Sequence, residues 1–252
     1  MNQEAAKPKV DYIYGMHPVM EAIKSQKTID KVLVQSDLKG PNITELRRLL
    51  KDHKISSQNL PLGRLNHLYK KNHQGVVALL SPIEFQPFEE VLNKTFESGK
   101  TPLFLILDRV SDVGNFGAIC RSAECLGVDH IIIPVKGSAQ INDEAIKRSS
   151  GALMNISVSR ERDLAEVCKT LNQSGLKLIG CSEKAEKHIY QLKYDLPLAM
   201  VMGSEKDGIN STIVKTLDEM ALIPMSGKTE SLNVAASSAI VLSEISRQRG
   251  GF

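Results

Sequence analysis

The sequence predicts an α/β protein whose larger, C-terminal part is built on a parallel β-sheet, with a smaller α/β domain before it. Three apolar segments, at 103–107, 130–134 and 198–202, lack the polar alternation of half-exposed strands and are typical of strands buried in a parallel sheet. A helix is predicted between the first two, over 116–126, with Gly127 at its end. Strand, helix and strand in this order form a right-handed βαβ unit with parallel strands.

Length and composition are those of an ordinary globular protein. The chain has 252 residues, of which 42% are hydrophobic and 24% charged, enough for one large domain or two smaller ones. No apolar run reaches membrane-spanning length, and the first ten residues lack the apolar stretch of a secretory signal. The four cysteines form no CxxC pair and do not cluster with the six histidines. We therefore expect a cytoplasmic protein with reduced thiols and no metal site.

Positive charge is concentrated in the N-terminal third of the chain. Residues 1–83 contain thirteen Lys and Arg against seven Asp and Glu, a net charge of +6, whereas 84–252 contain nineteen against twenty-two, a net charge of −3. This asymmetry predicts that a domain at 1–83 contacts a polyanion such as RNA. A second domain is expected over 101–252, after a linker at 84–100 that contains one short helix at 88–97.

Short strands and helices alternate within the first domain and predict a small βαβαβ-like unit. The strands are expected at 12–14, 31–35, 55–57 and 75–80, and the helices at 18–25, 42–53 and 62–69. The segment RLNHLYKKNHQG, at 64–75, places several basic residues next to Tyr69. Phosphate contacts with aromatic stacking on RNA fit this composition, and a solvated loop is the alternative. The residues predicted to bind RNA are Arg64, Lys70, Lys71 and His73.

The strand at 103–107 leads through a polar loop at 108–114 into the helix at 116–126. Asn115 stands just before this helix and could serve as its N-cap. Arg121 lies on a helix made, apart from Glu124, of small and apolar residues, which favours a functional role. A structural ion pair with Glu124 is the alternative for Arg121.

Two further strand–loop–helix junctions follow. The strand at 198–202 runs into Gly203, Glu205 and Gly208, after which Asn210 or Ser211 is expected to cap a helix reaching about residue 219. The strand at 221–225 runs through a loop at 226–230 into a helix at 232–247 that is rich in small residues. We expect this last helix to be buried on most sides. Polar loops at strand ends are where α/β folds place ligands.

Taken in order, these junctions resemble the motifs of the SpoU/TrmH family of SPOUT methyltransferases, which transfer methyl from S-adenosylmethionine to ribose 2′-oxygens of RNA. The three matching segments are LDRVSDVGNFGAICRSAECLGV, VMGSEKDGI and IPMSGKTESLNVAASSAIVL. The N-terminal segments YIYGMHPVMEAI and NHQGVVALL resemble the L30e-like substrate-binding domain of the subgroup that methylates a guanosine of 23S rRNA. No GxGxxG or Walker motif supports a dinucleotide- or ATP-dependent enzyme instead.

The resemblance implies a deep trefoil knot in the C-terminal domain, S-adenosylmethionine as cofactor, and a homodimer with the helix at 232–247 in its interface. It assigns the cofactor to Gly203, Ile223, Met225 and Leu232. It assigns catalysis to Asn115, Arg121, Glu205, Ser231 and Asn233. The chain departs from the family at Val113, where proline is usual, which puts the rigidity of that loop in question.

The resemblance also offers Arg121 as a general base, but a guanidinium with a pKa above about 12 is better suited to clamp a phosphate. Glu205 and Asn233 are expected to hold the loops and to orient Arg121 or the ribose, and Ser231 to supply a nearby hydrogen bond. Two alternatives stay open at this point. One is a ribose methyltransferase acting on tRNA, or one that confers antibiotic resistance through rRNA. The other is an RNA-binding ribosome-assembly protein with an inactive methyltransferase domain.

Overall fold

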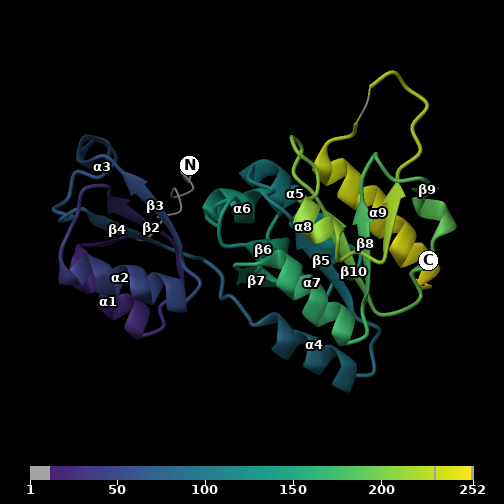
Figure 1. Ribbon diagram of the computed structural model, residues 1–252, viewed down its shortest axis with the longest axis horizontal. Helices are drawn as coiled ribbons and strands as arrows, with labels where there is room; N and C mark the ends of the chain where they lie inside the picture. The colour runs from purple at the N-terminus through teal and green to yellow at the C-terminus, as the bar shows by residue number, and fades with distance from the viewer. Residues whose placement is uncertain (1–11, 230, 251–252) are drawn as a thin grey trace, which may run out of the picture. The chain divides into compact units, whose positions relative to one another are not determined.

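The computed structural model describes residues 12–229 and 231–250 (Figure 1). Glu230, at the end of the predicted loop 226–230, lies outside the described residues. The chain divides into two compact units. The first comprises the residues up to Ile83 together with 140–143, and the second comprises 84–139 and the residues from 144 onward.

The first unit is a four-stranded sheet in the order β1-β4-β2-β3. Its strands are β1 (Tyr12–Tyr14), β2 (Ile29–Gln35), β3 (Ser56–Leu60) and β4 (Val76–Leu80). Its helices are α1 (Met16–Lys24), α2 (Pro41–Asp52) and α3 (Leu62–Leu68). Strands β2 and β3 are parallel, but β4 lies antiparallel between β1 and β2. The sheet is therefore mixed, which corrects the expectation of a simple βαβαβ unit.

Alternation along the strands separates the two faces of this sheet. On one face, Val32 and Val34 of β2 pack with α1 and α2, whose buried residues include Ile23 and Leu46. On the other face, Leu33 of β2 packs with Leu65 of α3, and the partly buried Tyr14 and Tyr69 join this smaller cluster. The inward positions predicted for α2 are buried as expected; they are Ile43, Leu46, Leu49 and Leu50.

The second unit is built on a seven-stranded sheet in the order β7-β6-β5-β10-β8-β11-β9, in which the described pairs are parallel. This confirms the predicted α/β class. The strands are β5 (Leu103–Leu107), β6 (His130–Pro134), β7 (Ser157–Glu161), β8 (Lys177–Cys181), β9 (Lys187–His188), β10 (Leu198–Met202) and β11 (Glu219–Leu222). The helices are α4 (Phe88–Glu97), α5 (Val113–Cys125), α6 (Asp143–Arg148), α7 (Leu164–Gln173), α8 (Ser211–Val214) and α9 (Val234–Gln248). Two short 3₁₀ helices lie at Ala152–Met154 and Ile189–Gln191.

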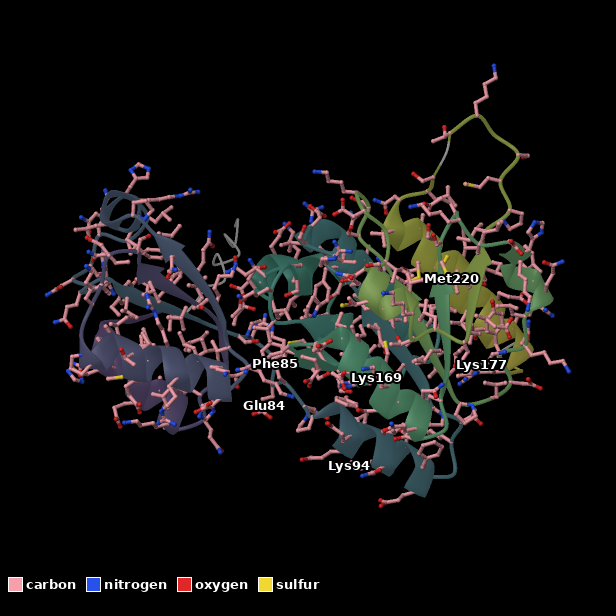
Figure 2. The ribbon with its side chains drawn as sticks, in the orientation of Figure 1. Glu84, Phe85, Lys94, Lys169, Lys177 and Met220 are labelled. Carbon is pink, nitrogen blue, oxygen red and sulfur yellow. The ribbon has the colours of Figure 1, made fainter. Side chains whose placement is uncertain are left out.

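Residues 84–100, expected as a linker, belong to the second unit. Phe88 and Leu92 are four residues apart on one face of α4, and both are buried in the core that contains Phe104 of β5. The exposed side chains of α4 and α7 include Lys94 and Lys169 (Figure 2). The segment is thus held by apolar packing and does not stand apart from the domain.

The helix after Asn210 is shorter than predicted. Asn210 caps it as expected, since its side chain accepts a hydrogen bond from the Thr212 amide, but α8 ends at Val214. The chain then turns at Asp218, whose carboxylate accepts a hydrogen bond from the Leu178 amide at 2.7 Å. This contact ties the chain to β8 and starts strand β11 earlier than the predicted 221.

Helix α9 is buried on one face, with Val241, Leu242 and Ile245 in the core. Its opposite face is partly exposed at Ala239 and Ile240, so the prediction of burial on most sides is wrong for a single chain. The C-cap of the helix is Arg249, whose guanidinium donates hydrogen bonds to four backbone carbonyls, those of Thr101, Pro102, Tyr194 and Leu196. None of the helices within 12–229 and 231–250 is long and apolar enough to cross a membrane.

Candidate active site

Three side chains from the three predicted junctions form one hydrogen-bonded cluster. Asn115 Nδ2 donates to Glu205 Oε1 at 2.8 Å, and Asn233 Nδ2 donates to the same carboxylate oxygen at 2.6 Å. Asn233 Nδ2 also lies 3.0 Å from Asn115 Oδ1. The cluster joins the start of α5, the loop after β10 and the start of α9. Because Glu205 accepts from both amides, its carboxylate holds the two helix starts together.

Each asparagine has a different place at its helix start. Asn233 is the N-cap of α9 and accepts from the Ala235 amide at 2.9 Å. Asn115 is not the N-cap of α5, so the N-cap role considered for it from the sequence is wrong. The cap of α5 is Asp112, whose carboxylate accepts from the Asn115 amide at 2.7 Å. Val113 therefore occupies the first helical position, where proline is common. The hydrogen bond to the Asp112 cap holds this turn without a proline.

A pocket lies beside this cluster and is lined by Glu205 and Asn233 themselves. All four residues predicted to contact the cofactor line it, as does Ser231; they are Gly203, Ile223, Met225 and Leu232. Met225 and Leu232 are 42% and 40% exposed. A bound ligand would cover this apolar surface.

Several lining residues were missed by the sequence interpretation. Cys181, Ser182 and Glu183 come from the end of β8 and the loop that follows it, and Ser237 comes from the first turn of α9. The available signal was a polar Ser-Glu pair directly after an apolar strand, the same pattern that identified the other junctions. Burial raises the pKa of the Cys181 thiol to about 12, so the sulfur stays protonated at neutral pH and forms part of the pocket wall.

Gly203 is required by the backbone around it. A Cβ atom at this position would lie 2.2 Å from the carbonyl carbon of Gly208 and 2.3 Å from the Ile209 nitrogen. The Ser204 amide donates to the Gly208 carbonyl, and the Gly208 amide donates to the Ser204 carbonyl, which closes a tight loop around Glu205. The absence of a side chain at Gly203 lets two stretches of this loop approach each other.

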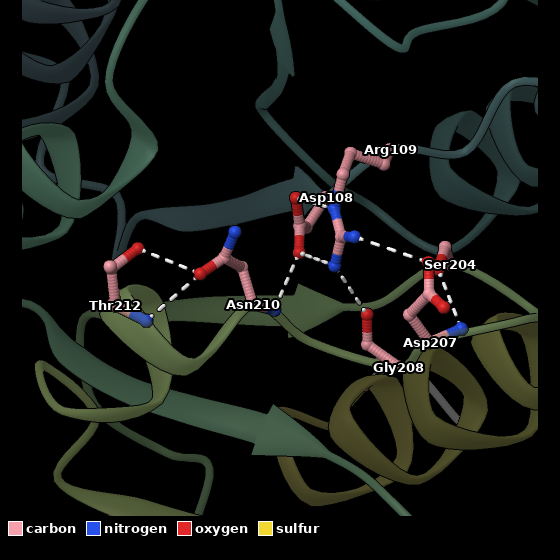
Figure 3. A network of polar contacts seen from close by, with 7 residues as sticks. All are labelled: Asp108, Arg109, Ser204, Asp207, Gly208, Asn210 and Thr212. Atoms are coloured by element: carbon pink, nitrogen blue, oxygen red, sulfur yellow. Dashed lines mark hydrogen bonds and ion pairs between the residues drawn. The ribbon is translucent and has the colours of Figure 1, made fainter.

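Asp108 and Arg109, directly after β5, anchor this loop (Figure 3). The Arg109 guanidinium donates to both oxygens of the buried Asp108 carboxylate, at 3.0 and 2.9 Å, and to the Gly208 carbonyl at 3.0 Å. The hydrogen bonds with Asp108 raise the pKa of Arg109. Asp108 in turn accepts from the Asn210 amide at 2.7 Å. Arg109 adopts a positive φ of 58°, a strained conformation for a residue with a side chain.

Replacing Arg109 with alanine should lower the free energy of unfolding by about 2 to 3 kcal/mol, because the buried Asp108 charge would lose its partner. We expect less than for a fully buried pair since the Arg109 side chain is 32% exposed. Urea unfolding followed by circular dichroism measures the change. The matched control is Arg148→Ala, which breaks an exposed ion pair with Glu144 and should cost less than about 1 kcal/mol. Equal midpoints for the two variants would contradict the prediction.

Arg121 lies on α5, six residues beyond Asn115 and about 9 Å further along the helix axis. Its side chain is exposed, and it forms no hydrogen bond or ion pair with any residue in the described part of the chain. The alternative of an ion pair with Glu124 is therefore not found within 12–229 and 231–250. The structure brings Asn115, Glu205, Ser231 and Asn233 to one site and leaves Arg121 on the adjoining helix surface.

The residues predicted to bind RNA in the first unit differ in accessibility. Arg64, Lys70 and Lys71 are exposed. His73 is only 4% exposed, and its two ring nitrogens contact Asn66 Oδ1 at 2.9 Å and the Gly75 amide at 3.0 Å. Nδ1 accepts the hydrogen bond from the Gly75 amide, and Nε2 faces the Asn66 oxygen. His73 holds the turn before β4 and is buried, so it offers little surface for the predicted contact with RNA.

Comparisons with known proteins agree with this arrangement. Residues 102–243 match the SpoU rRNA Methylase family, and residues 12–86 match the family described as RNA 2′-O ribose methyltransferase substrate binding. A relative from Staphylococcus saprophyticus, named "Putative TrmH family tRNA/rRNA methyltransferase", is 33% identical over 94% of this chain and 95% of its own length.

Two solved structures show the same fold. The SpoU methyltransferase AviRb from Streptomyces viridochromogenes, in complex with the cofactor AdoMet, has a TM-score of 0.60 and 22% identity over 96% of this chain and 91% of its own. The TrmH/SpoU tRNA modifying enzyme from A. aeolicus has a TM-score of 0.55 and 25% identity over 65% of this chain and 84% of its own.

Fold, pocket and polar cluster together define an RNA methyltransferase that uses S-adenosylmethionine. More particularly, the chain belongs to the SpoU/TrmH family.

Proposed function

We propose that this protein transfers the methyl group of S-adenosylmethionine to the 2′-oxygen of a ribose in RNA, with a guanosine of 23S rRNA as the substrate. The observation that carries the proposal is the Asn115–Glu205–Asn233 cluster beside the pocket. It places a carboxylate and two amides next to a ligand site with apolar and backbone walls. Such a site orients a ligand through a few fixed polar groups.

The residues of this pocket fit the cofactor. Met225 and Leu232 would cover its apolar parts, and Ser182 and Glu183 would offer a hydroxyl and a carboxylate to its hydroxyl and amino groups. When bound, the cofactor supplies a methyl group on a positively charged sulfur, so that its leaving group is neutral. The protein therefore has two tasks, which are to align the ribose oxygen with the methyl group and to assist loss of its proton.

The polar cluster is proposed to perform the alignment. Glu205 is fixed by two amide donors and keeps the loop after β10 against the starts of α5 and α9. Ser231 lies one residue before Leu232 on the pocket wall and can hydrogen-bond to the ribose. Arg121 is free to bind a phosphate of the RNA, for which the fork of its guanidinium is suited. In this proposal any base function of Arg121 depends on deprotonation that is induced by substrate binding.

The first unit supports rRNA over tRNA as the substrate. The substrate-binding match covers 12–86, whereas the A. aeolicus tRNA modifying enzyme matches only 65% of this chain, a share about as long as the second unit. A tRNA enzyme of this kind needs no counterpart of the first unit. The excess of positive charge in residues 1–83 supplies the contacts that an extended rRNA substrate requires.

Methyl transfer from radiolabelled S-adenosylmethionine tests the proposal. Unmodified 23S rRNA and bulk tRNA are offered in parallel, and alkaline hydrolysis locates the label, since a 2′-O-methyl group blocks cleavage at its own nucleotide. Label on a 23S guanosine is the expected result. Label on tRNA would overturn the substrate. Cofactor binding without transfer to either RNA or to assembling ribosomal particles would favour the inactive RNA-binding alternative.

The exposed face of α9 supports the proposal of a homodimer. Ala239, Ile240 and Ser243 line a shallow depression together with Tyr190, which is 57% exposed. We expect the protein to sediment at twice its chain mass of 27.7 kDa, and Ile240→Glu to sediment as a single chain. Phe96→Glu, which changes an exposed aromatic residue on α4, is the matched control and should stay dimeric. Analytical ultracentrifugation measures both, and a dimeric Ile240→Glu variant would place the interface elsewhere.

A further inference from the structure

Three of the five tyrosines in the chain form one cluster on the first unit. The ring centroids of Tyr12 and Tyr69 are 5.2 Å apart and those of Tyr12 and Tyr14 are 6.1 Å apart. Tyr12 and Tyr14 are two residues apart on β1, so they point to the same face of the sheet. Strand β1 is at the edge of that sheet.

Two tyrosines of the cluster pack against the core of the unit, and the third is exposed. Tyr14 and Tyr69 pack against Leu65 and Val77 in the smaller core of the unit. Tyr12 packs on both of them and is 37% exposed. An aromatic ring held from one side by other rings keeps its position and presents a surface to which a flat partner can stack.

A lysine contacts the cluster, and further basic residues lie close to Tyr69 in the sequence. The Lys71 ammonium lies 5.4 Å from the centroid of the Tyr14 ring. Arg64 and Lys70 are exposed and form no ion pair with the part of the chain that the structure describes. Between His53 and Ile83 the sequence contains Lys54, Arg64, Lys70 and Lys71 and no aspartate or glutamate.

We propose that Tyr12, supported by Tyr14 and Tyr69, stacks on an unpaired base of the RNA substrate while Arg64, Lys70 and Lys71 contact the neighbouring phosphates. This inference rests on the proposed function, because it names the kind of RNA that the first unit selects. A base inside a continuous duplex is already stacked on its neighbours and is not free to stack on the tyrosine. The first unit therefore selects RNA with a single-stranded loop or bulge.

Other occupants fit the surface less well. Leu62 and Leu68 of α3 are also exposed, at 44% and 51%, and apolar residues of this kind suit a protein partner. The absence of acidic residues from 53–83, together with four basic ones, instead matches a polyanion. Aromatic rings next to basic side chains are the combination that single-stranded RNA binding uses.

Fluorescence anisotropy of labelled RNA with the full-length protein tests the inference. The probes are an RNA hairpin with a single-stranded loop and a fully paired duplex of equal length. Tyr12→Ala should raise the Kd for the hairpin about tenfold, whereas Tyr12→Phe, which keeps the ring, should bind as the wild type does. Phe96→Ala removes an exposed aromatic ring from the second unit and is the matched control. The duplex should bind more weakly than the hairpin and respond little to Tyr12→Ala.

Intrinsic fluorescence supplies a second measurement, because the chain contains no tryptophan and its emission comes from tyrosine. Stacking of a base should quench this emission on addition of the hairpin, and the quenching should be smaller in Tyr12→Phe at unchanged affinity. Unchanged hairpin affinity in Tyr12→Ala would overturn the inference, as would an equal loss of affinity for the duplex. Loss of binding to a ribosomal protein, with RNA affinity intact, would also overturn it.

The failure of this inference can be told apart from failure of the proposed function. In methyl-transfer assays Tyr12→Ala should raise the KM for RNA and leave kcat unchanged, since the ring is proposed to bind RNA and not to take part in the chemical step. Methyl transfer that is insensitive to Tyr12 would overturn the stacking inference and leave the proposed function standing. Tyr12-dependent binding of the hairpin without methyl transfer to any RNA would support the stacking surface and overturn the proposed function.

Discussion

Replacing Gly203 with alanine should lower methyl transfer by about 100-fold and weaken S-adenosylmethionine binding in parallel. The added Cβ would lie 2.2 Å from the Gly208 carbonyl carbon, so one of the two backbone stretches must move by about 1 Å or more. Glu205 lies between these stretches, and its hydrogen bonds to Asn115 and Asn233 would lengthen with the shift. The pocket wall and the polar cluster would therefore be displaced together.

Isothermal titration with the cofactor and initial rates of methyl transfer measure the two effects. Gly227→Ala is the matched control, because a Cβ there meets nothing within 4 Å and no positive φ is involved. It should bind cofactor as the wild type does. Unimpaired cofactor binding in Gly203→Ala would contradict the prediction. It would show that the loop tolerates the displacement, and the cofactor would have to be bound by other residues than those of this loop.

Replacing Arg121 with alanine should lower kcat/KM for RNA by about 10- to 100-fold while cofactor binding stays unchanged. Arg121 is exposed and forms no hydrogen bond or ion pair with the described residues, so the fold should be unaffected. A hydrogen-bonded ion pair with a phosphate contributes about 1.5 to 3 kcal/mol, which corresponds to this range of rates. Arg121→Lys should recover only part of the loss, because an ammonium cannot form the two parallel bonds of a guanidinium.

The control for Arg121 is Arg162→Ala, which removes an exposed arginine from the same unit and should leave the rate unchanged. Near wild-type turnover in Arg121→Lys would contradict the role of the guanidinium fork. A complete loss of turnover in both Arg121 variants, with RNA affinity intact, would favour the base over the phosphate clamp. The pH dependence of kcat in the wild type separates these two roles further.

The buried strands of the second unit were predicted closely because their sequence pattern is local. Apolar runs without alternation predict Leu103–Leu107, His130–Pro134 and Leu198–Met202 at the bounds that the structure shows. Capping residues predict helix starts less accurately, since any of several polar residues near the start of a helix can be its N-cap. Asp112 caps α5, although Asn115 was the candidate. The deep trefoil knot implied by the family resemblance stays a prediction.

Burial of polar side chains could not be predicted from the same patterns. His73 stands among basic residues in the sequence, but its ring is buried by contacts with Asn66 and Gly75. Arg109 follows a strand, as solvated arginines also do, and only the fold shows its hydrogen bonds to Asp108 and Gly208. Such roles depend on partners up to about a hundred residues away, which no local window contains.

The sequence alone determined the α/β class, the polar junctions after its apolar strands and the family to which their spacing belongs. Only the tertiary structure decided that Asn115, Glu205 and Asn233 share hydrogen bonds, although up to 118 residues separate them. The physical reason is the parallel sheet, which brings the carboxyl ends of strands distant in sequence to one edge. Local pattern specifies each strand and loop, and the packing of the sheet specifies which loops meet.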